Sequence, residues 1–433
     1  MINFNSWKEN IFRTYNGANG KKKCLVFNNE PYMVKIMDTA QIGTKPMGAI
    51  SEYLGCHIYD LLGIPVQDTV LGKYTNPKTN EIFWAVACKD FCGINDKLLD
   101  FSTVRNSIVF SSKEGNTKEL EPILISIEEQ NMVPVNNLKK RFWDMFIIDA
   151  LIGNFDRHTG NFGLIVNEAQ QIIKLAPVYD CGSSLYPSPT DEQICEILQN
   201  EQAKLARVYE FPASCYLDEN NQKYKYHELI LSNKYSDCTK SLFQLKPRID
   251  STISEINTLI DSIEGISDIR KNFYKTMISL RKERIIDYAY EKINSKIQAT
   301  VLETDVIMNE AHKREQYIAT IKPMDNSIIS EYIRLYQHII QLSIFQVQTE
   351  HTHLRNSDID AIIVSALKKE KRFSDDAIIN VCEQYSPAAV GKKNYGKRIL
   401  IKSKLPSFKS YSTSFILNMN SNLSKVENNN CSR

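Results

Sequence analysis

The chain has 433 residues, 42% of them hydrophobic, which is enough for a packed core and for two or three domains. Its 53 lysines and arginines nearly balance 51 aspartates and glutamates, which argues against a surface built wholly for nucleic acid or an anionic membrane. With 16 glycines, 14 prolines and no apolar run of about 18 residues, the composition excludes a collagen-like chain and predicts no membrane span.

Ten cysteines are scattered along the chain. The closest pair, Cys88 and Cys92, has neither a second pair nor clustered histidines to complete a zinc site. We therefore expect free thiols in a reducing compartment, and a protein that is cytoplasmic at synthesis. The N-terminus lacks the apolar segment of a Sec signal, so export as a translocated effector would need another route.

The N-terminal part reads as a small sheet carrying one helix. Strands are predicted over residues 23–28, 31–36, 70–74 and 82–88. Between the second and third strands, Ser51–Leu62 has helical spacing, with Ser51 as the expected N-cap and Gly63 ending the helix.

From about residue 120 the pattern is mostly helical, with a buried helix over 138–151, a short hairpin over 164–175 and amphipathic segments over 190–295. A polar stretch near 296–312 reads as a boundary. We predict an α+β, two-lobed fold with a C-terminal helical extension. Its expected parts are an N-terminal lobe, a helical C-terminal lobe, a helical extension and a basic, disordered tail, over residues 1–91, 92–298, 299–390 and 391–433.

The segment GNFDRHTGNFG at 153–163 carries the clearest chemical signal. Asp156 and Asn161 match the kinase catalytic-loop spacing D-x-x-x-x-N, in which the aspartate orients the acceptor hydroxyl and the asparagine binds a metal. After the hairpin, Asp180 opens a D-x-G sequence of the kind that supplies a second Mg²⁺ ligand. Either aspartate alone would read as an ordinary loop carboxylate, but the ordered pair favours phosphoryl transfer from ATP with Mg²⁺.

Further candidates lie upstream in the expected order. Lys35 ends a strand where a lysine would reach the phosphates, and Glu52 in the next helix would pair with it. The backbone at Lys89 and Phe91 follows the last strand of the lobe, where a hinge would bind adenine. A loop that would surround the phosphates precedes the first strand, although it also reads as an ordinary turn; it contains Gly17, Ala18, Asn19 and Gly20.

Two residues follow the predicted base directly, and we expect mainly structural roles for them. We expect His158 to pack and hydrogen-bond within the loop rather than to take part directly in catalysis. Arg157 is expected to brace the loop or contact a phosphate.

At this point the sequence resembles the HipA-family kinases, and within them the cell-translocating kinase A branch. The matching strings include NNEPYMVKI, FWDMFIIDALIGNFDRHTGNFG and APVYDCGSSLYP, and the resemblance covers about residues 12–295. It implies a protein-kinase-like fold and phosphorylation of Ser/Thr in protein substrates, with autophosphorylation. It also implies that Asp156 is the base, that Asn161 and Asp180 bind metal, and that Lys35 binds phosphates. One departure concerns the ribose, because Cys92 stands where HipA carries an acidic residue; Asp96 is a candidate replacement.

Residues 301–433 lie outside the resemblance and are nearly balanced in charge. We expect an amphipathic helix over 327–346 and a regulatory or targeting module that docks on a partner. The basic stretch 391–410, with its interleaved aromatic residues, would suit nucleic acid, a membrane surface or an acidic partner, although nucleic acid is disfavoured and a solvated tail is the simpler interpretation. Two other functions stay open: a kinase fold with a lipid or small-molecule acceptor, and a nucleotide-binding toxin or regulator acting through this tail.

Overall fold

The computed structural model describes residues 1–15, 21–38, 45–93, 95–108, 118–298, 328–336, 356–369, 371, 373–386, 389 and 392–404. It forms two compact units, Met1–Asn294 and Ser295–Arg433. In the part of the chain so described, no helix combines the length and apolar character needed to cross a membrane.

The N-terminal lobe of the first unit is built on a six-stranded sheet with the order β1-β5-β6-β4-β3-β2. Its strands are β1 (Ile2–Asn3), β2 (Lys8–Glu9), β3 (Lys21–Phe27), β4 (Glu30–Ile36), β5 (Thr69–Thr75) and β6 (Ile82–Lys89). All pairs are antiparallel except β1 with β5. A 3₁₀ turn, η1 (Phe4–Ser6), joins β1 to β2 and buries Phe4 on the sheet. The four predicted strands are confirmed as β3 to β6, and β1 and β2 are additions that sequence patterns did not reveal.

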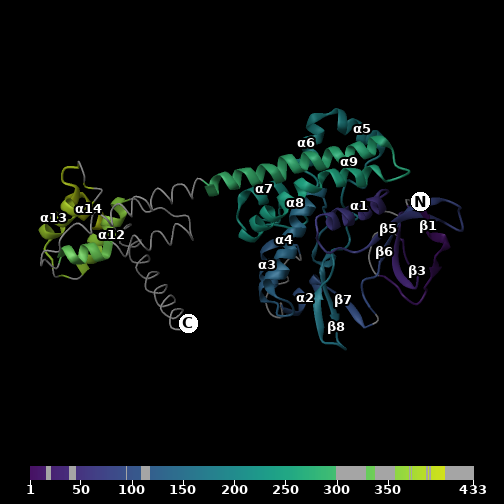
Figure 1. Ribbon diagram of the computed structural model, residues 1–433, viewed down its shortest axis with the longest axis horizontal. Coiled ribbons are helices and arrows are strands. Elements are labelled where there is room, and N and C mark those ends of the chain that lie inside the picture. The colour runs from purple at the N-terminus through teal and green to yellow at the C-terminus, as the bar shows by residue number, and fades with distance from the viewer. Residues whose placement is uncertain are drawn as a thin grey trace. The chain divides into compact units, whose positions relative to one another are not determined.

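Helix α1 (Gly48–Leu61) lies against β5 and β6 (Figure 1). It begins three residues earlier than predicted, and Ser51 is therefore not the N-cap but a fully buried residue inside the helix. The expected end is confirmed, because Gly63 adopts a left-handed φ of 72° just after the helix.

The C-terminal lobe is helical and packs around α4 (Val135–Ile152), which is buried from Phe142 to Ile152. This explains the apolar stripe that the sequence shows on most sides of α4. Figure 1 shows the sheet on one side of the unit and α2, α3 and α4 on the other, with α1 between them. The remaining helices are α2 (Phe101–Ile108), α3 (Leu120–Glu129), α5 (Asp191–Gln199), α6 (Glu201–Tyr209), α7 (Tyr226–Ser232), α8 (Ser236–Asp261) and α9 (Asp268–Arg281). A π-helical segment, η3 (Lys282–Asp287), continues α9 into a helix that runs to residue 298.

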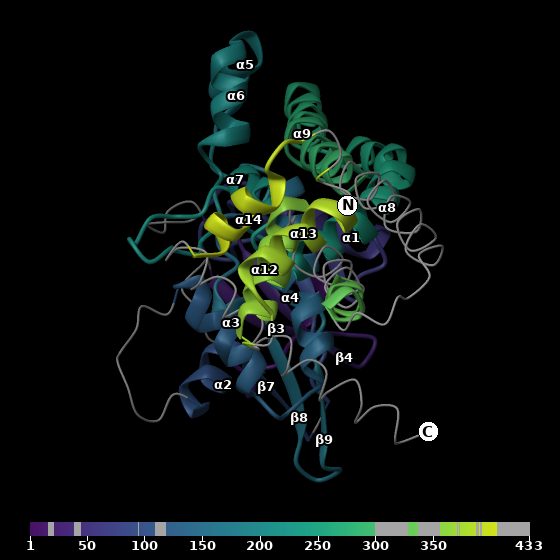
Figure 2. The same cartoon turned by 90° about the vertical axis from the view of Figure 1, so that its left-hand side faces the viewer.

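A second, three-stranded sheet has the order β7-β8-β9. The predicted hairpin is confirmed as β8 (Gly163–Asn167) and β9 (Ile172–Leu175), and β7 (Asp96–Asp100) pairs with β8. Figure 2 shows this hairpin projecting from the unit at the end opposite α5 and α6. Because β7 follows the hinge and β8 follows the catalytic loop, their pairing brings those two segments together.

The second unit contains a helical segment at 328–336 together with α12 (Asn356–Lys369), α13 (Asp375–Tyr385) and α14 (Tyr395–Lys404). These helices share one apolar cluster. The expectation of disorder from residue 391 is wrong for α14, because Tyr395, Ile399 and Leu400 are buried in that cluster. Of the amphipathic helix predicted over 327–346, residues 328–336 are helical, and the remainder lies outside the described residues.

Candidate active site

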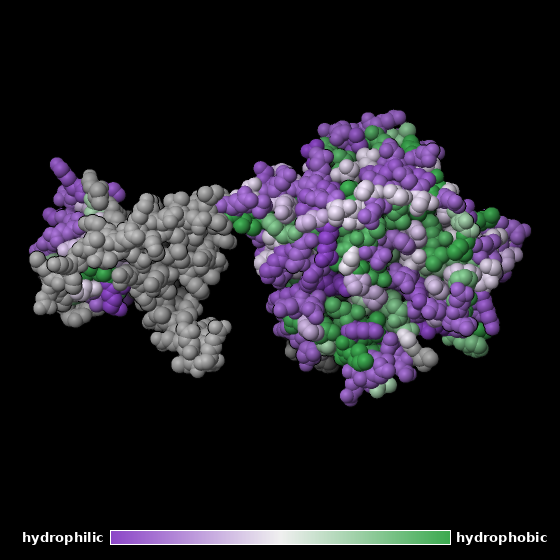
Figure 3. Space-filling model, viewed as in Figure 1, coloured by the Kyte–Doolittle hydropathy of each residue, from purple (hydrophilic) through white to green (hydrophobic). Residues whose placement is uncertain are grey.

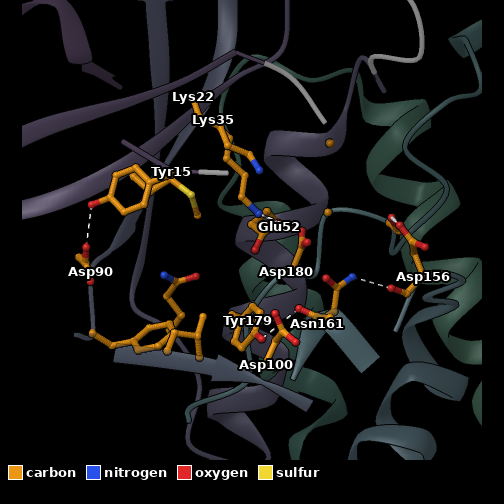
Figure 4. A pocket seen from close by; sticks show the side chains of 18 of the residues that line it. Tyr15, Lys22, Lys35, Glu52, Asp90, Asp100, Asp156, Asn161, Tyr179 and Asp180 are labelled. Atoms are coloured by element: carbon orange, nitrogen blue, oxygen red, sulfur yellow. Dashed lines mark hydrogen bonds and ion pairs between the residues drawn. The ribbon is translucent and has the colours of Figure 1, made fainter. Parts of the chain in front are cut away.

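The ammonium group of Lys35 lies at the centre of the site. Strand β4 places its Nζ 2.9 Å from Glu52 Oε2 and 2.9 Å from Asp180 Oδ1 (Figure 4). Burial alone would lower the pKa of Lys35, but the charges of Asp180 and Glu52 raise it well above 10.5. The group therefore remains a cation, as contact with phosphate requires.

Glu52 joins the two lobes through a single carboxylate. Its Oε2 accepts from Lys35 in the sheet, and its Oε1 accepts from the backbone N–H of Cys181 at 3.1 Å. Gly55, one turn further along α1, approaches so closely that a Cβ there would lie 2.6 Å from Cys181 Cβ. Helix α1 is thus packed directly on the segment that carries Asp180.

Asp180 has an unusual backbone and a perturbed carboxyl group. Its φ is 59°, in the left-handed region that residues other than glycine rarely adopt. Burial would raise the pKa of its carboxyl, but the charge and hydrogen bond of Lys35, followed by the charge of Arg157, lower it from 3.8 to about 2. Asp180 is therefore ionised and able to bind a cation at neutral pH.

The catalytic loop begins where α4 ends, at Gly153 with a φ of 64°. Arg157 then turns inward: its Nε lies 2.9 Å from Asp149 Oδ2, and both side chains are almost fully buried. The same guanidinium donates to the carbonyls of Asn161, at 3.1 Å, and Tyr179. Of the two readings given for Arg157, bracing of the loop is confirmed.

Asp156 and Asn161 are held by contacts within this loop. The side-chain nitrogen of Asn161 donates to the backbone carbonyl of Asp156 at 2.6 Å, so its amide oxygen is left for another partner. His158 accepts from the N–H of Gly160 at 3.0 Å and caps the 3₁₀ turn η2 (Thr159–Asn161). The expectation that His158 serves as a hydrogen-bonding element of the loop is confirmed.

A cavity of about 740 Å³ brings the candidates together. Lys35, Glu52, Asp156, Asn161 and Asp180 all line it. Figure 4 shows Lys35, Glu52 and Asp180 in the middle, with Asp156 on one side and Tyr15 and Asp90 on the other. The space is large enough for a nucleotide.

The predicted hinge is only partly exposed to this cavity. Phe91 lines it beside Tyr179, with ring centroids 5.8 Å apart, and the two rings offer an apolar surface for a base. Lys89 directs its side chain to Glu30, and its N–H donates to the carbonyl of Asp68 at 2.8 Å. The Lys89 carbonyl accepts from Gln67 Nε2 at 2.9 Å, and among the described residues Lys89, unlike Phe91, does not line the cavity.

The predicted phosphate loop, with Gly17, Ala18, Asn19 and Gly20, lies outside the described residues. Its N-terminal approach is anchored at the hinge. Tyr15 donates to Asp90 Oδ2 at 2.7 Å, and Arg13 forms an ion pair with the same carboxylate at 2.5 Å.

The donor set suits Mg²⁺. Asn161 offers an amide oxygen and Asp180 a carboxylate, and hard oxygen ligands are the ones this ion prefers. Among the described residues, no group of three or more His, Cys, Asp or Glu side chains is placed to hold a metal without other ligands. Phosphate oxygens and water would complete the coordination, as is usual for nucleotide-bound Mg²⁺.

Several lining residues were missed by sequence reasoning, namely Lys22, Lys45, Gln67, Asp90, Tyr179 and Ser183. Lys22, Lys45 and Gln67 reach the cavity through tertiary packing. The other three had a usable signal, since Tyr179 and Ser183 flank Asp180-Cys181-Gly182 and Asp90 lies between Lys89 and Phe91. Asp96 also lines the cavity, but its carboxylate accepts from Asn167 at 2.7 Å and from the N–H of Gly93 at 3.2 Å.

Comparison with known proteins gives the class. Residues 16–258 match the family model of the HipA-like C-terminal domain. The chain is 38% identical over 294 residues to the serine/threonine-protein kinase CtkA of Helicobacter pylori, covering 67% of this chain and 88% of that protein. The chain therefore belongs to the HipA-like family and has its α+β, kinase-like fold.

The solved structure of one relative supports this assignment. The crystal structure of the Helicobacter pylori proinflammatory kinase CtkA matches with a TM-score of 0.62 at 38% identity, over 67% of this chain and 98% of that one. A Shewanella oneidensis complex of HipA, HipB and operator DNA matches with a TM-score of 0.40 at 14% identity, over 64% of this chain and 68% of that one.

Proposed function

We propose that the protein is an ATP- and Mg²⁺-dependent kinase that phosphorylates Ser/Thr residues of protein substrates, with autophosphorylation. The observation that carries the proposal is the Lys35 ammonium, 2.9 Å from both Glu52 and Asp180, in the cavity that Asp156 and Asn161 also line. A protein that only binds nucleotide has no use for a carboxylate at the position of Asp156. The identity to the kinase CtkA supports a protein acceptor.

The roles follow from the geometry. Lys35 would contact the α- and β-phosphates, while Asn161 and Asp180 would hold Mg²⁺, which neutralises phosphate charge. Phe91 and Tyr179 would enclose the adenine. Asp156 would orient the acceptor hydroxyl and take its proton as the new O–P bond forms.

Partner choice is assigned to the second unit. Residues 301–433 lie outside the match to the HipA-like family model, which covers residues 16–258, and would bind a regulatory or targeting partner, whether the protein acts in the cytoplasm or as a translocated effector. The near balance of charge argues against nucleic acid as that partner.

The test is transfer of labelled γ-phosphate by the purified protein, alone and with a generic acceptor protein. Asp156→Ala should reduce transfer by roughly 10²–10⁴-fold, the range for loss of a general base, with ATP affinity unchanged. Asp237→Ala, in the first turn of α8 where the carboxylate is partly exposed and pairs with Lys240, is the matched control and should behave as wild type. Undiminished transfer by Asp156→Ala would remove this residue from the mechanism, and a wild-type protein without transfer to any acceptor would refute the proposed function.

A further inference from the structure

Among the described residues, the lysines that line the cavity are Lys22, Lys35 and Lys45, and the assignments above use only Lys35. Lys45 lies just before α1. Its Nζ contacts the hydroxyl of Ser183 and lies 4.6 Å from the centre of the Phe155 ring. Both partners are uncharged. Among the described residues, no carboxylate lies within ion-pair distance of Lys45, whereas Lys35 is bound to Glu52 and Asp180.

Ser183 connects Lys45 to the predicted base. Its Oγ lies 3.5 Å from Asp156 Oδ2. An ammonium group only donates and a carboxylate only accepts, so the hydroxyl must accept from Lys45 and donate to Asp156. These two contacts place Ser183, which is itself buried, between Lys45 and Asp156, and all three residues line the cavity.

The electrostatic setting suits a group that binds an anion. Burial lowers the pKa of Lys45 from 10.5, an effect opposed by the charges of Asp156 and Asp180 and increased by that of Lys35. A partly desolvated cation that has exchanged water for a hydroxyl and an aromatic face gains more from a phosphate oxygen than a solvated one.

Phosphoryl transfer needs positive charge at the group in transit as well as at the phosphates that stay behind. Lys35, between Glu52 and Asp180, is placed for the phosphates that remain on ADP. We propose that Lys45 is a catalytic residue that binds the transferring phosphoryl group beside Asp156, and that Ser183 is a positioning residue that holds its ammonium there. This inference rests on the proposed kinase function.

Transfer of the phosphoryl group breaks one bond and forms one. The bond from the γ-phosphorus to the β,γ-bridging oxygen breaks, and its electron pair leaves with ADP. The acceptor hydroxyl oxygen bonds to the phosphorus while its proton passes to Asp156. Lys45 moves from the Ser183 hydroxyl to a γ-phosphate oxygen and remains protonated throughout.

The test compares Lys45→Met and Lys45→Arg in the full chain, with Lys97→Met as control because Lys97 is 72% exposed and pairs with Glu168. Loss of one such donor should lower kcat by roughly 10²–10³-fold. Calorimetry should show ADP affinity unchanged and affinity for a non-hydrolysable ATP analogue reduced, since only the analogue carries a γ-phosphate. Lys45→Arg should recover part of kcat.

Ser183→Ala tests the positioning role. It should lower kcat in the wild-type background and add little in Lys45→Met, because the lysine it positions is then absent. The inference is overturned if Lys45→Met keeps kcat within about threefold of wild type, or if ADP and analogue affinities fall together. It is also overturned if Lys45→Met lowers both the melting temperature and kcat and Lys45→Arg restores neither of them. A wild-type protein without transfer would instead refute the proposed function itself.

Discussion

The buried pair of Arg157 and Asp149 gives the sharpest stability prediction. Arg157 is 2% and Asp149 1% exposed, and Asp149 also accepts from Tyr59 at 2.9 Å and Asn154 at 3.0 Å. Replacing Arg157 with methionine leaves a carboxylate buried without its cation, a change that costs about 3–5 kcal/mol.

The size of the first unit converts this energy into a temperature. An unfolding entropy of about 2.1 cal/mol/K per residue over Met1–Asn294 gives about 0.6 kcal/mol/K. Arg157→Met should therefore lower the melting temperature of this unit by about 5–8 °C, measured by calorimetry. Lys97→Met, which breaks an exposed pair with Glu168, should change it by less than about 1 °C.

The double variant separates charge from packing. Asp149→Asn with Arg157→Met removes both charges, so it should be more stable than Arg157→Met alone. Phosphoryl transfer should nevertheless stay low, because the Arg157 bonds to the carbonyls of Asn161 and Tyr179 are lost in both variants. The reasoning is refuted if Arg157→Met melts within about 1 °C of wild type, or if the two changes are simply additive.

Three further outcomes are expected. Lys35→Met removes the charge that lowers the pKa of Asp180 to about 2, while burial remains, so the pKa of Asp180 should rise. On acidification, calorimetric titration should then show that the variant loses Mg²⁺–ATP binding at a higher pH than wild type does. Coinciding pH profiles would contradict the assignment of Asp180. Autophosphorylation should occur within residues 6–15, because Thr14 lines the cavity and a phosphate there would repel ATP. Mass spectrometry that finds phosphate only elsewhere, or none, would contradict this location. A chain ending near residue 300 should stay folded and transfer phosphate at a rate within a few-fold of that of the full-length chain. Insolubility of this shorter chain, or its inactivity in the transfer assay, would make residues 301–433 part of the catalytic unit.

Much of the site was predictable because its chemistry lies in local motifs. Asp156, Asn161 and Asp180 have fixed spacings around a hairpin, and Lys35 and Glu52 lie on adjacent elements of a small lobe. Lys45 and Gln67 were not predictable, since each reaches the cavity only through packing of distant segments.

The fold shows the same division. Strands β3 to β6 and the helix α4 follow from alternation and apolar periodicity, whereas β1, β2 and β7 are short and take their structure from the strands they pair with. The start of α1 was misplaced because Ser51 resembles a cap, although burial against the large lobe carries the helix back to Gly48. The order of α14 was hidden by its basic composition, although its buried residues recur at the three- and four-residue intervals of an amphipathic helix.

The carboxylate of Glu52 has a consequence for ligand discovery. Because it contacts Lys35 and the Cys181 N–H at once, it ties β4, α1 and the segment that carries Asp180 to one another. A compound that displaces α1 from both the sheet and the segment carrying Asp180 must break both contacts and separate Gly55 from Cys181. Flat adenine mimics should therefore outperform inhibitors of the helix-displacing type against this protein.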